Sequence, residues 1–572
     1  MQIVTKYRIP ALLCALAVCL CELIAHPLAN MGVCDDWPYI LMAQKLAATG
    51  HVVYNGWAAP MLTWQLYLAA ALVKLFGFSF VTVRLSSILV GAMMAFLLQR
   101  TLVRAGINDR NATIGTLAFV LSPLYLMLSA TFMTDIHGLF ALVLCLYGCL
   151  RALQSRTSRT TTGWLCFAIV TNALCGTSRQ NAWLGILVMV PSTLWLLRAQ
   201  RRVLLAGISA NLLGGLFIVG CMQWLKHQPY SIPEHLLFTT FPLASTFWQF
   251  IFFFLEFPFL LLPLAAMFLP EIRRSRPRIV AILCAVLLGY FFLSFFPSHL
   301  RGDFRLEPTL GNWVSVEGGY ETVPVSHPPI FLSTSIRVLL TIASLGGLLG
   351  LIASLFRASD ITRPTPSPFS VSWKQLAVIL GPFSLAYGLL LLPRAASTGI
   401  FDRYFPALVL VAMLCLARWY QDRVQPNLPF ASVFLVAIMA VYGVANTHDM
   451  FALDRARVDL AAELRANGVP ETSVDNGWEY NLGTELQHAD HINFPTIVVP
   501  AHAYVPVPPL PADSCPMFWY DYFPHIHPLY GVSFDPNACY GPAPFAPVHY
   551  SRWPYRAPGT LYIVRYTPAA KP

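Results

Sequence analysis

The chain has few charged residues for its size. Asp, Glu, Lys and Arg make up 11% of its 572 residues, whereas hydrophobic residues make up 56%. Soluble domains carry about a quarter charged residues, so this composition excludes an ordinary soluble protein and predicts a multi-spanning membrane protein. The formal net charge of +10 indicates contact with anionic membrane lipid and no nucleic-acid partner, because the excess comes from arginines in loops between apolar runs.

Several motifs of soluble catalysis are also missing. The sequence contains no CxxC pair, no HExxH motif, no Gly-rich phosphate loop and no internal repeat. Without a dinucleotide-binding signature, we expect no nucleotide substrate. All but two of the 13 cysteines lie in or beside apolar runs, where they are core residues. The remaining pair, Cys515 and Cys539, predicts a disulfide if its compartment is oxidising.

Apolar runs predict thirteen membrane spans. At about 1.5 Å per residue, a run of about 20 residues crosses a hydrocarbon core of about 30 Å. A cleaved signal peptide is an alternative for the first run, but no small-x-small cleavage site fits well and many spans follow. The predicted spans are 10–28, 85–104, 112–131, 136–152, 162–178, 181–197, 203–223, 247–269, 279–297, 333–356, 375–393, 404–420 and 428–446.

Basic residues predict the orientation of these spans. Loops on one side hold about twice as many Lys and Arg as those on the other, as the positive-inside rule expects of cytoplasmic loops. This places the N-terminus in the cytoplasm, and an odd number of spans places the C-terminus outside. The apolar segment Leu62–Phe80 is interpreted as an interfacial or re-entrant helix, because counting it as a span would put every later arginine cluster outside.

The chain therefore divides into two predicted domains. Residues 1–446 form the transmembrane domain, with a long, structured first outer loop at about 29–84, and residues 447–572 form a small outer α/β domain. In the latter, the pattern predicts an amphipathic helix over 451–466 that ends before Gly468. Strand-like runs follow, such as 496–499 and 561–566.

The most informative residues are the adjacent pair Asp35 and Asp36, just beyond the first span. Two carboxylates at a bilayer edge are costly to bury, and no cationic residue stands beside them in sequence, so they point to chemistry. Asp135 falls between the third and fourth spans, on the same predicted side as Asp35. The alternative for Asp135 is a helix N-cap.

Other polar residues near the spans have both functional and plain interpretations. Arg179 lies in a short outer turn, where the alternative is an anchor that reaches the membrane surface. Arg403 either binds a ligand or forms a surface ion pair with its neighbour Asp402. His137 is interpreted as a packed side chain rather than a metal ligand. Glu256 lies in the middle of a span, where an acid is either functional or neutralised by protonation.

Together these positions resemble a known family. The stretch CDDWPYILMAQKLAATG, the following PMLTWQLYLAAALVKLFG, Asp135 at the start of the fourth span, and RYFPAL entering a late span are similar to GT-C membrane glycosyltransferases that use polyprenyl-phosphate sugars. The resemblance is to bacterial members of the protein O-mannosyltransferase and lipid A aminoarabinose transferase superfamily. It covers about residues 8–420.

The resemblance implies an all-α, GT-C-like polytopic fold and a set of site residues. Asp35 aligns with the family's first acid and is expected to be the base, with Asp36 and Asp135 as orienting or metal-coordinating acids. The donor phosphate-binding residues that the resemblance implies are Arg403, Arg179 and Tyr404. The family often has Asp-Glu where this chain has Asp-Asp, and often His or Glu where Trp57 to Ala59 stand. No cofactor is certain, and a divalent metal stays an open alternative.

The expected chemistry agrees with these residues. A sugar on polyprenyl phosphate already has a good leaving group, so transfer needs only a base for the acceptor hydroxyl and positive charge for the departing phosphate. We expect a multi-pass protein of the bacterial inner membrane that transfers the sugar to a lipid, glycan or protein at the outer face.

Two other interpretations remain. One is a transporter or lipid flippase, but such proteins place ionisable residues near the midplane and often have repeats, whereas only Glu22 and Glu256 lie deep here. The other is a family member that has lost activity and acts as a scaffold.

Overall fold

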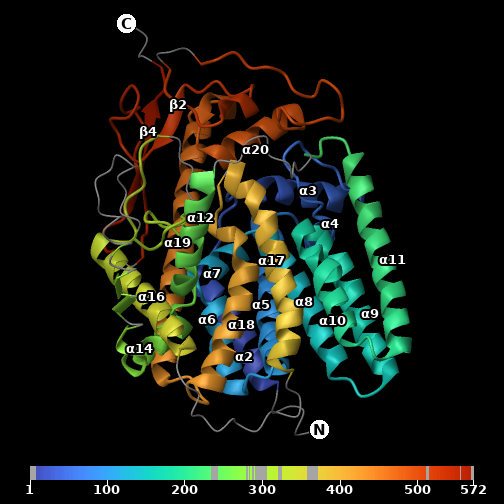
Figure 1. Ribbon diagram of the computed structural model, residues 1–572. Helices are drawn as coiled ribbons and strands as arrows, with labels where there is room; N and C mark the ends of the chain where they lie inside the picture. Colours follow the sequence, from blue (N-terminus) through green and yellow to red (C-terminus); the bar gives the residue numbers. More distant parts are fainter. Residues whose placement is uncertain are drawn as a thin grey trace, which may run out of the picture.

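The molecule is a helical bundle with a small mixed sheet at one end (Figure 1). The computed structural model describes residues 8–232, 243–278, 306–319, 325–356, 371–397, 399–510, 514–553 and 555–567, with a few isolated positions between 281 and 289. The predicted span 279–297 lies almost wholly outside the described residues. The fold class predicted from the sequence, a mostly helical polytopic membrane protein, is confirmed.

Helices occupy the predicted spans that the structure describes. In chain order they are α2 (Ile9–Ala25), α5 (Phe80–Arg104), α6 (Asp109–Val120), α7 (Pro123–Ser129), α8 (Thr134–Leu153), α9 (Ser158–Cys175), α10 (Val190–Leu196), α11 (Arg201–Lys226), α12 (Leu243–Leu260), α13 (Leu262–Ala265), α14 (Leu269–Arg274), α16 (Thr334–Leu355), α17 (Trp373–Ser397), α18 (Pro406–Arg423) and α19 (Phe430–Ala466).

Six of the described helices are long and apolar enough to cross a membrane. The number rises to eight if two bent pairs, which turn by 67° and 72°, each count as one span. Pro123 begins the second helix of the first bent pair, and proline cannot continue an uninterrupted helix without loss of a hydrogen bond. The predicted count of thirteen stays a prediction. The six are α5, α8, α11, α16, α17 and α19.

Two short helices form the first connecting loop between α2 and α5. They are α3 (Asp36–Thr49) and α4 (Thr63–Phe76), each of 14 residues. At about 1.5 Å per residue α4 is only about 21 Å long, less than a hydrocarbon core of about 30 Å. Its length therefore agrees with the prediction that Leu62–Phe80 does not cross. Both helices lie at the end of the bundle nearest the sheet (Figure 1).

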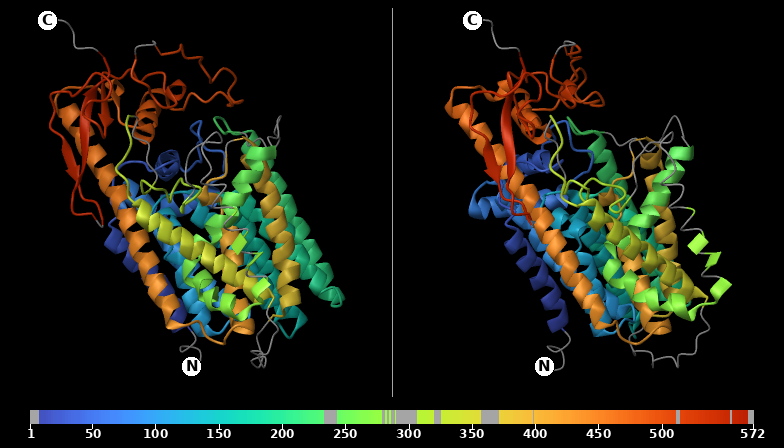
Figure 2. Two further views of the ribbon diagram at one scale, coloured as in Figure 1. Left: turned by 60° about the vertical axis from the view of Figure 1, so that its left-hand side comes forward. Right: turned by 90° about the vertical axis from the view of Figure 1, so that its left-hand side faces the viewer.

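The C-terminal unit is attached to the bundle by α19. This helix of 37 residues runs without a break through the predicted domain boundary at 446, and its far end packs under the sheet (Figure 2). The helix ends at Ala466, and Gly468 follows with φ +78°, which confirms the predicted glycine cap. The start of α2 and the sheet lie at opposite ends of the molecule.

The sheet has four strands in the order β1-β2-β4-β3. β1 (Val474–Asp475) pairs parallel with β2 (Tyr530–Ser533), and β4 (Gly559–Arg565) pairs antiparallel with both β2 and β3 (Val548–Tyr550). Helix α20 (Trp478–Ala489) follows β1. The predicted strand at 561–566 is confirmed, whereas the one at 496–499 is wrong. Pro495 and Pro500 flank the latter, and proline lacks the N–H that a ladder needs.

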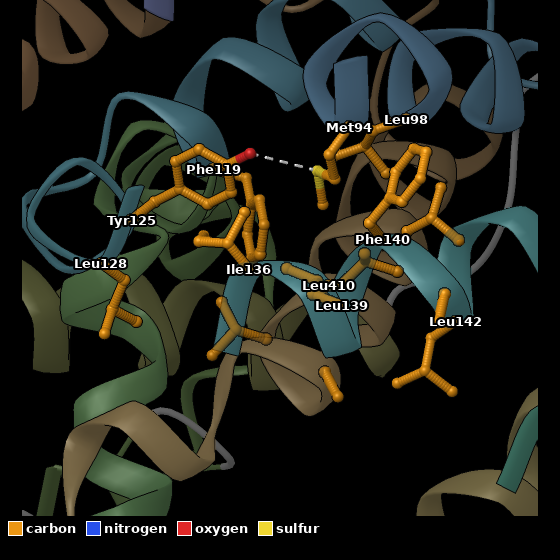
Figure 3. Close-up of a cluster of buried hydrophobic side chains, with 14 of the residues drawn as sticks. Met94, Leu98, Phe119, Tyr125, Leu128, Ile136, Leu139, Phe140, Leu142 and Leu410 are labelled. Carbon is orange, nitrogen blue, oxygen red and sulfur yellow. Dashed lines mark hydrogen bonds between the residues drawn. The ribbon is translucent and has the colours of Figure 1, made fainter. Parts of the chain in front are cut away.

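The bundle core is a continuous apolar cluster. Figure 3 shows part of it, where Phe119, Ile136 and Leu139 lie close together and the hydroxyl of Tyr125 faces Met94. That hydroxyl also donates to the carbonyl of Gly91 at 2.8 Å, so its polar atom is satisfied in the core. The predicted disulfide between Cys515 and Cys539 is confirmed, with Cα atoms 5.5 Å apart.

Candidate functional site

Asp35 lies at the N-terminus of α3 and is partly exposed. One carboxylate oxygen, Oδ2, accepts from a guanidinium nitrogen of Arg403 at 3.2 Å, although 368 residues separate the two in sequence. The other oxygen, Oδ1, accepts from the indole N–H of Trp57 at 3.0 Å. The side chain of Asp35 is 21% exposed, so this acid can meet a ligand from outside the bundle.

Asp36 is fully buried and faces the other way. Its carboxylate pairs with Arg84 of α5 at 2.8 and 3.1 Å and accepts from the backbone N–H groups of Val33 at 2.7 Å and Phe132 at 3.2 Å. Arg84 also donates to two backbone carbonyls of the loop before α3. These contacts fix the start of α3 to the bundle, so the geometry suits an orienting role for Asp36.

Asp135 lies in the first turn of α8 and pairs with Arg179. The N-cap of α8 is Met133, so the helix-cap interpretation of Asp135 is wrong. Arg179 comes from an irregular turn after α9 and is only 17% exposed, so it lies against α8 and not at the membrane surface. Gly138 makes room for it: an added Cβ there would lie 3.2 Å from the Cβ of Arg179.

Three arginines surround the ring of Tyr404. The guanidinium carbons of Arg179, Arg394 and Arg403 lie 5.6, 6.0 and 5.5 Å from its centroid. We call these three residues the arginine cluster. Tyr404 and Arg403 belong to the short 3-10 helix η5 (Asp402–Tyr404), which directly precedes α18. Asp35 pairs with Arg403 and Asp135 with Arg179, and guanidinium groups gathered around one ring favour an anionic ligand.

Charges of the site act on one another at short range. Burial acts to lower the pKa of Arg403, but Cys34, Tyr404, Asp35 and Asp135 together raise it well above its usual range, so the guanidinium stays charged. Burial is the main cause that raises the pKa of Tyr39, followed by the charge of Asp35. Arg403 acts to lower this pKa, and Asp135 acts to raise it. Tyr39 is therefore a neutral phenol near both acids.

Two polar atoms at the site are buried without a hydrogen-bond partner in the described structure. They are Oδ2 of Asp135 and Nε of Arg403. Because burial of an unpaired polar atom costs free energy, native proteins rarely keep one without a reason. The unpaired carboxylate oxygen can accept a hydrogen bond and the unpaired N–H can donate one. The two atoms therefore suit a polar ligand that carries both a donor, such as a hydroxyl, and an acceptor, such as a phosphate oxygen.

A divalent metal was left as an open alternative, and the side chains at the site offer no set of ligands for one. Nowhere in the described ranges do three His, Cys, Asp or Glu side chains come together in a way that could hold a metal ion. Asp35 and Asp135 each face an arginine, so their charges are balanced by guanidinium groups. These residues do not fit a divalent cation. His137 is buried, with Nε2 3.2 Å from the hydroxyl of Ser87.

The remaining acids have structural partners. Asp402 does not pair with Arg403: it is buried and accepts from the backbone N–H groups of Trp313 at 2.9 Å and Val314 at 2.8 Å. The surface ion pair proposed for it is therefore wrong. Burial raises the pKa of Asp402 to about 7.

Two acids that the sequence placed deep in the membrane are also bonded. Ser129 donates to Glu22 at 2.6 Å, and the hydroxyl of Thr309 donates to Glu256 at 2.7 Å. Both acids are buried, and neither contacts the arginine cluster in the bonds described.

The C-terminal unit also reaches the site. Glu479 of α20 accepts from the backbone N–H of Cys34 at 3.2 Å, next to Asp35, and from Arg457 of α19 at 3.0 Å. Glu479 and Arg457 are both buried. The unit therefore supports the segment that carries Asp35.

Four residues of the site were not assigned from the sequence: Tyr39, Trp57, Arg84 and Arg394. Trp57 stands where the related family often has His or Glu, and that departure was a usable signal. Arg394 lies nine positions before Arg403, at the end of the preceding helix, and a shared bundle end could have indicated it. Nothing local indicates that Arg84 pairs with Asp36.

Fold and site thus define a multi-pass membrane protein with a cationic cluster beside a partly exposed carboxylate, at one end of its bundle. Residues 58–226 match the family model described as dolichyl-phosphate-mannose-protein mannosyltransferase. The match confirms the predicted resemblance to GT-C membrane glycosyltransferases. The matched segment contains Asp135 and Arg179 and leaves Asp35 and Arg403 outside it. No curated protein gave a match to the sequence.

Several solved structures are similar to the chain at low identity. ArnT from Cupriavidus metallidurans in the apo state is 16% identical with a TM-score of 0.41, over 81% of this chain and 82% of that chain. An oligosaccharyltransferase from Archaeoglobus fulgidus is 14% identical with a TM-score of 0.41, over 90% of this chain and 62% of that one. The Pmt1-Pmt2 protein O-mannosyltransferase of S. cerevisiae is 16% identical with a TM-score of 0.30, over 38% and 32%.

Proposed function

We propose that this protein transfers a sugar from a polyprenyl-phosphate donor to an acceptor hydroxyl at the outer face of a bacterial inner membrane. The observation that carries the proposal is the arginine cluster around Tyr404, one member of which, Arg403, also pairs with Asp35. A base and a phosphate-binding group thereby adjoin each other. Guanidinium groups bind phosphate oxygens with paired hydrogen bonds, so the cluster suits a lipid phosphate.

In the proposed reaction Asp35 is the base. The acceptor oxygen attacks the anomeric carbon of the donor sugar, and its proton passes to the Asp35 carboxylate. The bond between that carbon and the phosphate oxygen breaks, and the electron pair stays on the phosphate, where the arginine cluster stabilises the added charge. Asp135 holds Arg179 in place, and Asp36 holds the start of α3 through Arg84.

An apolar cavity beside the site suits the lipid tail of the donor. It has a volume of about 590 Å³ and is formed by α4, the end of α9 and α11. Thr177, one of its lining residues, stands two positions before Arg179 and accepts from the backbone N–H of Trp64 at 3.0 Å. The cavity therefore adjoins the arginine cluster and opens among exposed apolar side chains: Tyr67, Leu174, Phe217 and Trp224.

The proposal is tested with purified protein in nanodiscs, incubated separately with members of a panel of polyprenyl-phosphate sugars and an extract of envelope acceptors. Mass spectrometry measures released polyprenyl phosphate. We expect release with at least one donor, and a fall of about two to four orders of magnitude for Asp35→Asn, which keeps the shape but removes the base. Asp490→Asn is the control, because Asp490 is 95% exposed and its ion pair with Lys45, at 4.0 Å, is long and weak.

Two outcomes would contradict the proposal: no release from any donor, or equal release by Asp35→Asn and the wild type. The lipid cavity has its own test. Gly220 of α11 lines it and an added Cβ there meets no atom within 4 Å, so Gly220→Phe should fill the cavity and weaken binding of polyprenyl phosphate. Gly215→Phe, on the same helix and equally open, is the control.

A further inference from the structure

A group of aromatic side chains adjoins Asp35 through Trp57, which bonds the carboxylate oxygen that does not bond Arg403. Trp57, which donates to Asp35, has ring centroids of three others within 6 Å: Trp478 at 4.9 Å, Phe494 at 5.3 Å and Tyr522 at 5.7 Å. Trp478 in turn meets Trp519 at 5.3 Å and Phe518 at 5.9 Å. We call these residues the aromatic cluster: Trp57, Trp478, Phe494, Phe518, Trp519 and Tyr522.

The outer members of the aromatic cluster are open to solvent. Phe518 is 52% exposed and Trp519 is 46% exposed, whereas Trp478 beneath them is buried. Large aromatic side chains usually lose water contact when a protein folds, because they bury the most apolar area per residue. The exposed rings pack on a buried tryptophan and together form an exposed apolar patch. Such a patch on a folded domain often marks a binding site.

The backbone under these rings is held in an unusual conformation. Trp519 has φ +59°, in the left-handed region that bulky residues rarely adopt. The surrounding loop is fixed by the disulfide of Cys515 and by Asn493, whose amide donates to the carbonyls of Val505 at 2.8 Å and Asp521 at 2.9 Å. A strained residue held by its surroundings is a frequent mark of a ligand site. The aromatic cluster is therefore pre-formed.

We infer that the aromatic cluster is an acceptor subsite that binds a sugar ring, so that the acceptor of the reaction is a carbohydrate chain. The inference rests on the proposed function. The electron-rich face of an aromatic ring attracts the slightly positive C–H groups on the face of a pyranose. Sugar hydroxyls would meet polar side chains such as Asp521, which is exposed and stands in sequence between Trp519 and Tyr522.

The position of the cluster selects the acceptor over the donor. Asp35 uses Oδ2 toward Arg403, on the side of the donor phosphate, and Oδ1 toward Trp57, on the side of the aromatic cluster. A base must touch the acceptor hydroxyl, so a ring stacked beyond Trp57 belongs to the acceptor. Exposed tryptophans also serve as anchors at a membrane surface. A membrane anchor does not require contact with a catalytic acid, whereas Trp57 of this cluster bonds Asp35.

The test measures binding without any donor present, so it does not depend on turnover. Full-length protein in nanodiscs is titrated separately with chitotetraose, maltotetraose, mannotetraose and a Ser/Thr-rich octapeptide, by isothermal titration calorimetry. We expect saturable binding of at least one oligosaccharide. For that oligosaccharide, Trp519→Ala should weaken binding about tenfold or more, and Trp519→Phe should retain most of it.

Phe518→Ala gives an independent reading if Trp519→Ala fails to fold. Tyr540→Ala is the control, since Tyr540 is a partly exposed aromatic residue of the same unit outside the aromatic cluster. The inference is overturned if no oligosaccharide saturates, if only the peptide binds, or if the Trp519 and Phe518 variants bind as the wild type does. It is also overturned if these variants change only adsorption to empty lipid vesicles. If the wild-type protein binds an oligosaccharide but releases no polyprenyl phosphate from any donor, the proposed function is refuted and the binding site is not.

Discussion

Asp35 and Asp36 are neighbours in sequence, but they lie in opposite surroundings. Asp36 is fully buried, with Arg84 and two backbone N–H groups around it, while Asp35 is 21% exposed and contacts one guanidinium and one indole. The start of α3 causes the difference, because successive helical residues point about 100° apart. One carboxylate therefore turns into the bundle and the other toward the site.

The difference separates a structural acid from a chemical one. A base has to accept a proton during turnover, which a carboxylate held by a buried guanidinium and two N–H groups does poorly. Asp35 has fewer partners and access from outside. A pair that the sequence presents as equivalent is therefore expected to respond differently to the same substitution.

The largest expected effect is that of Asp36→Asn on folding. Removing one partner of a buried ion pair leaves Arg84 uncompensated, which costs about 3–5 kcal/mol. We expect a strongly lowered thermal unfolding midpoint in detergent and little folded protein, whereas Asp35→Asn should unfold close to the wild-type temperature. Equal unfolding temperatures for the two variants would remove the distinction between these acids.

The next effect concerns the arginine cluster beyond Asp35. Arg394→Gln removes one charge near Tyr404 without touching the Asp35–Arg403 pair. A charged hydrogen bond contributes about 1.5–3 kcal/mol, so binding of polyprenyl phosphate should weaken about 10- to 100-fold. Surface plasmon resonance on immobilised nanodiscs would measure the affinity for polyprenyl phosphate. The control is Arg198→Gln, because Arg198 is exposed in the turn between α10 and α11. Unchanged affinity of the Arg394→Gln variant for polyprenyl phosphate would exclude Arg394 from the phosphate site.

Asp402 extends the comparison to an acid that is buried like Asp36 but held by backbone N–H groups. Its folded-state pKa of about 7 lies above the ordinary value of 3.8, so the folded protein holds this proton more tightly than the unfolded chain. The resulting stability is complete below about pH 4 and is lost as the pH rises to about 7, by about 1.4 kcal/mol per pH unit.

Asp402→Asn should remove that pH dependence, because the amide oxygen can still accept from Trp313 and Val314. Relative to the wild type, the variant should be more stable at pH 8 than at pH 5, as measured by thermal unfolding at both pH values. A difference in unfolding midpoint that does not change with pH would show that Asp402 keeps its charge when folded.

The smallest effect is expected at Gly138. An added Cβ would lie 3.2 and 3.3 Å from side-chain carbons of Arg179, so Gly138→Ala should displace that arginine by a few tenths of an ångström. Transfer should fall only a few-fold, because a small misplacement weakens one member of the arginine cluster. Gly163→Ala, where an added Cβ meets no atom within 4 Å, is the matched control. A loss as large as that of Asp35→Asn would mean that Gly138 has another role.

Local patterns in the sequence predicted much of this structure. Apolar runs of membrane length gave the helices, Gly468 marked the end of α19, and two isolated cysteines formed the disulfide. The strand at 496–499 failed because β-branched residues favour a strand only where the backbone can join a ladder, and the prolines at 495 and 500 prevent that. Asp135 was correctly placed at the start of α8 but not as its cap.

The sequence by itself determined the membrane fold and the end of the bundle at which acids and arginines gather, because hydrophobicity and charge act residue by residue. Only the tertiary structure decided which charges meet: Arg84 takes Asp36, Arg403 takes Asp35, and Trp57 joins Asp35 to the aromatic cluster. These partners come from helices and loops far apart in the chain. Their pairing depends on how the bundle packs, and no short segment of sequence contains that information.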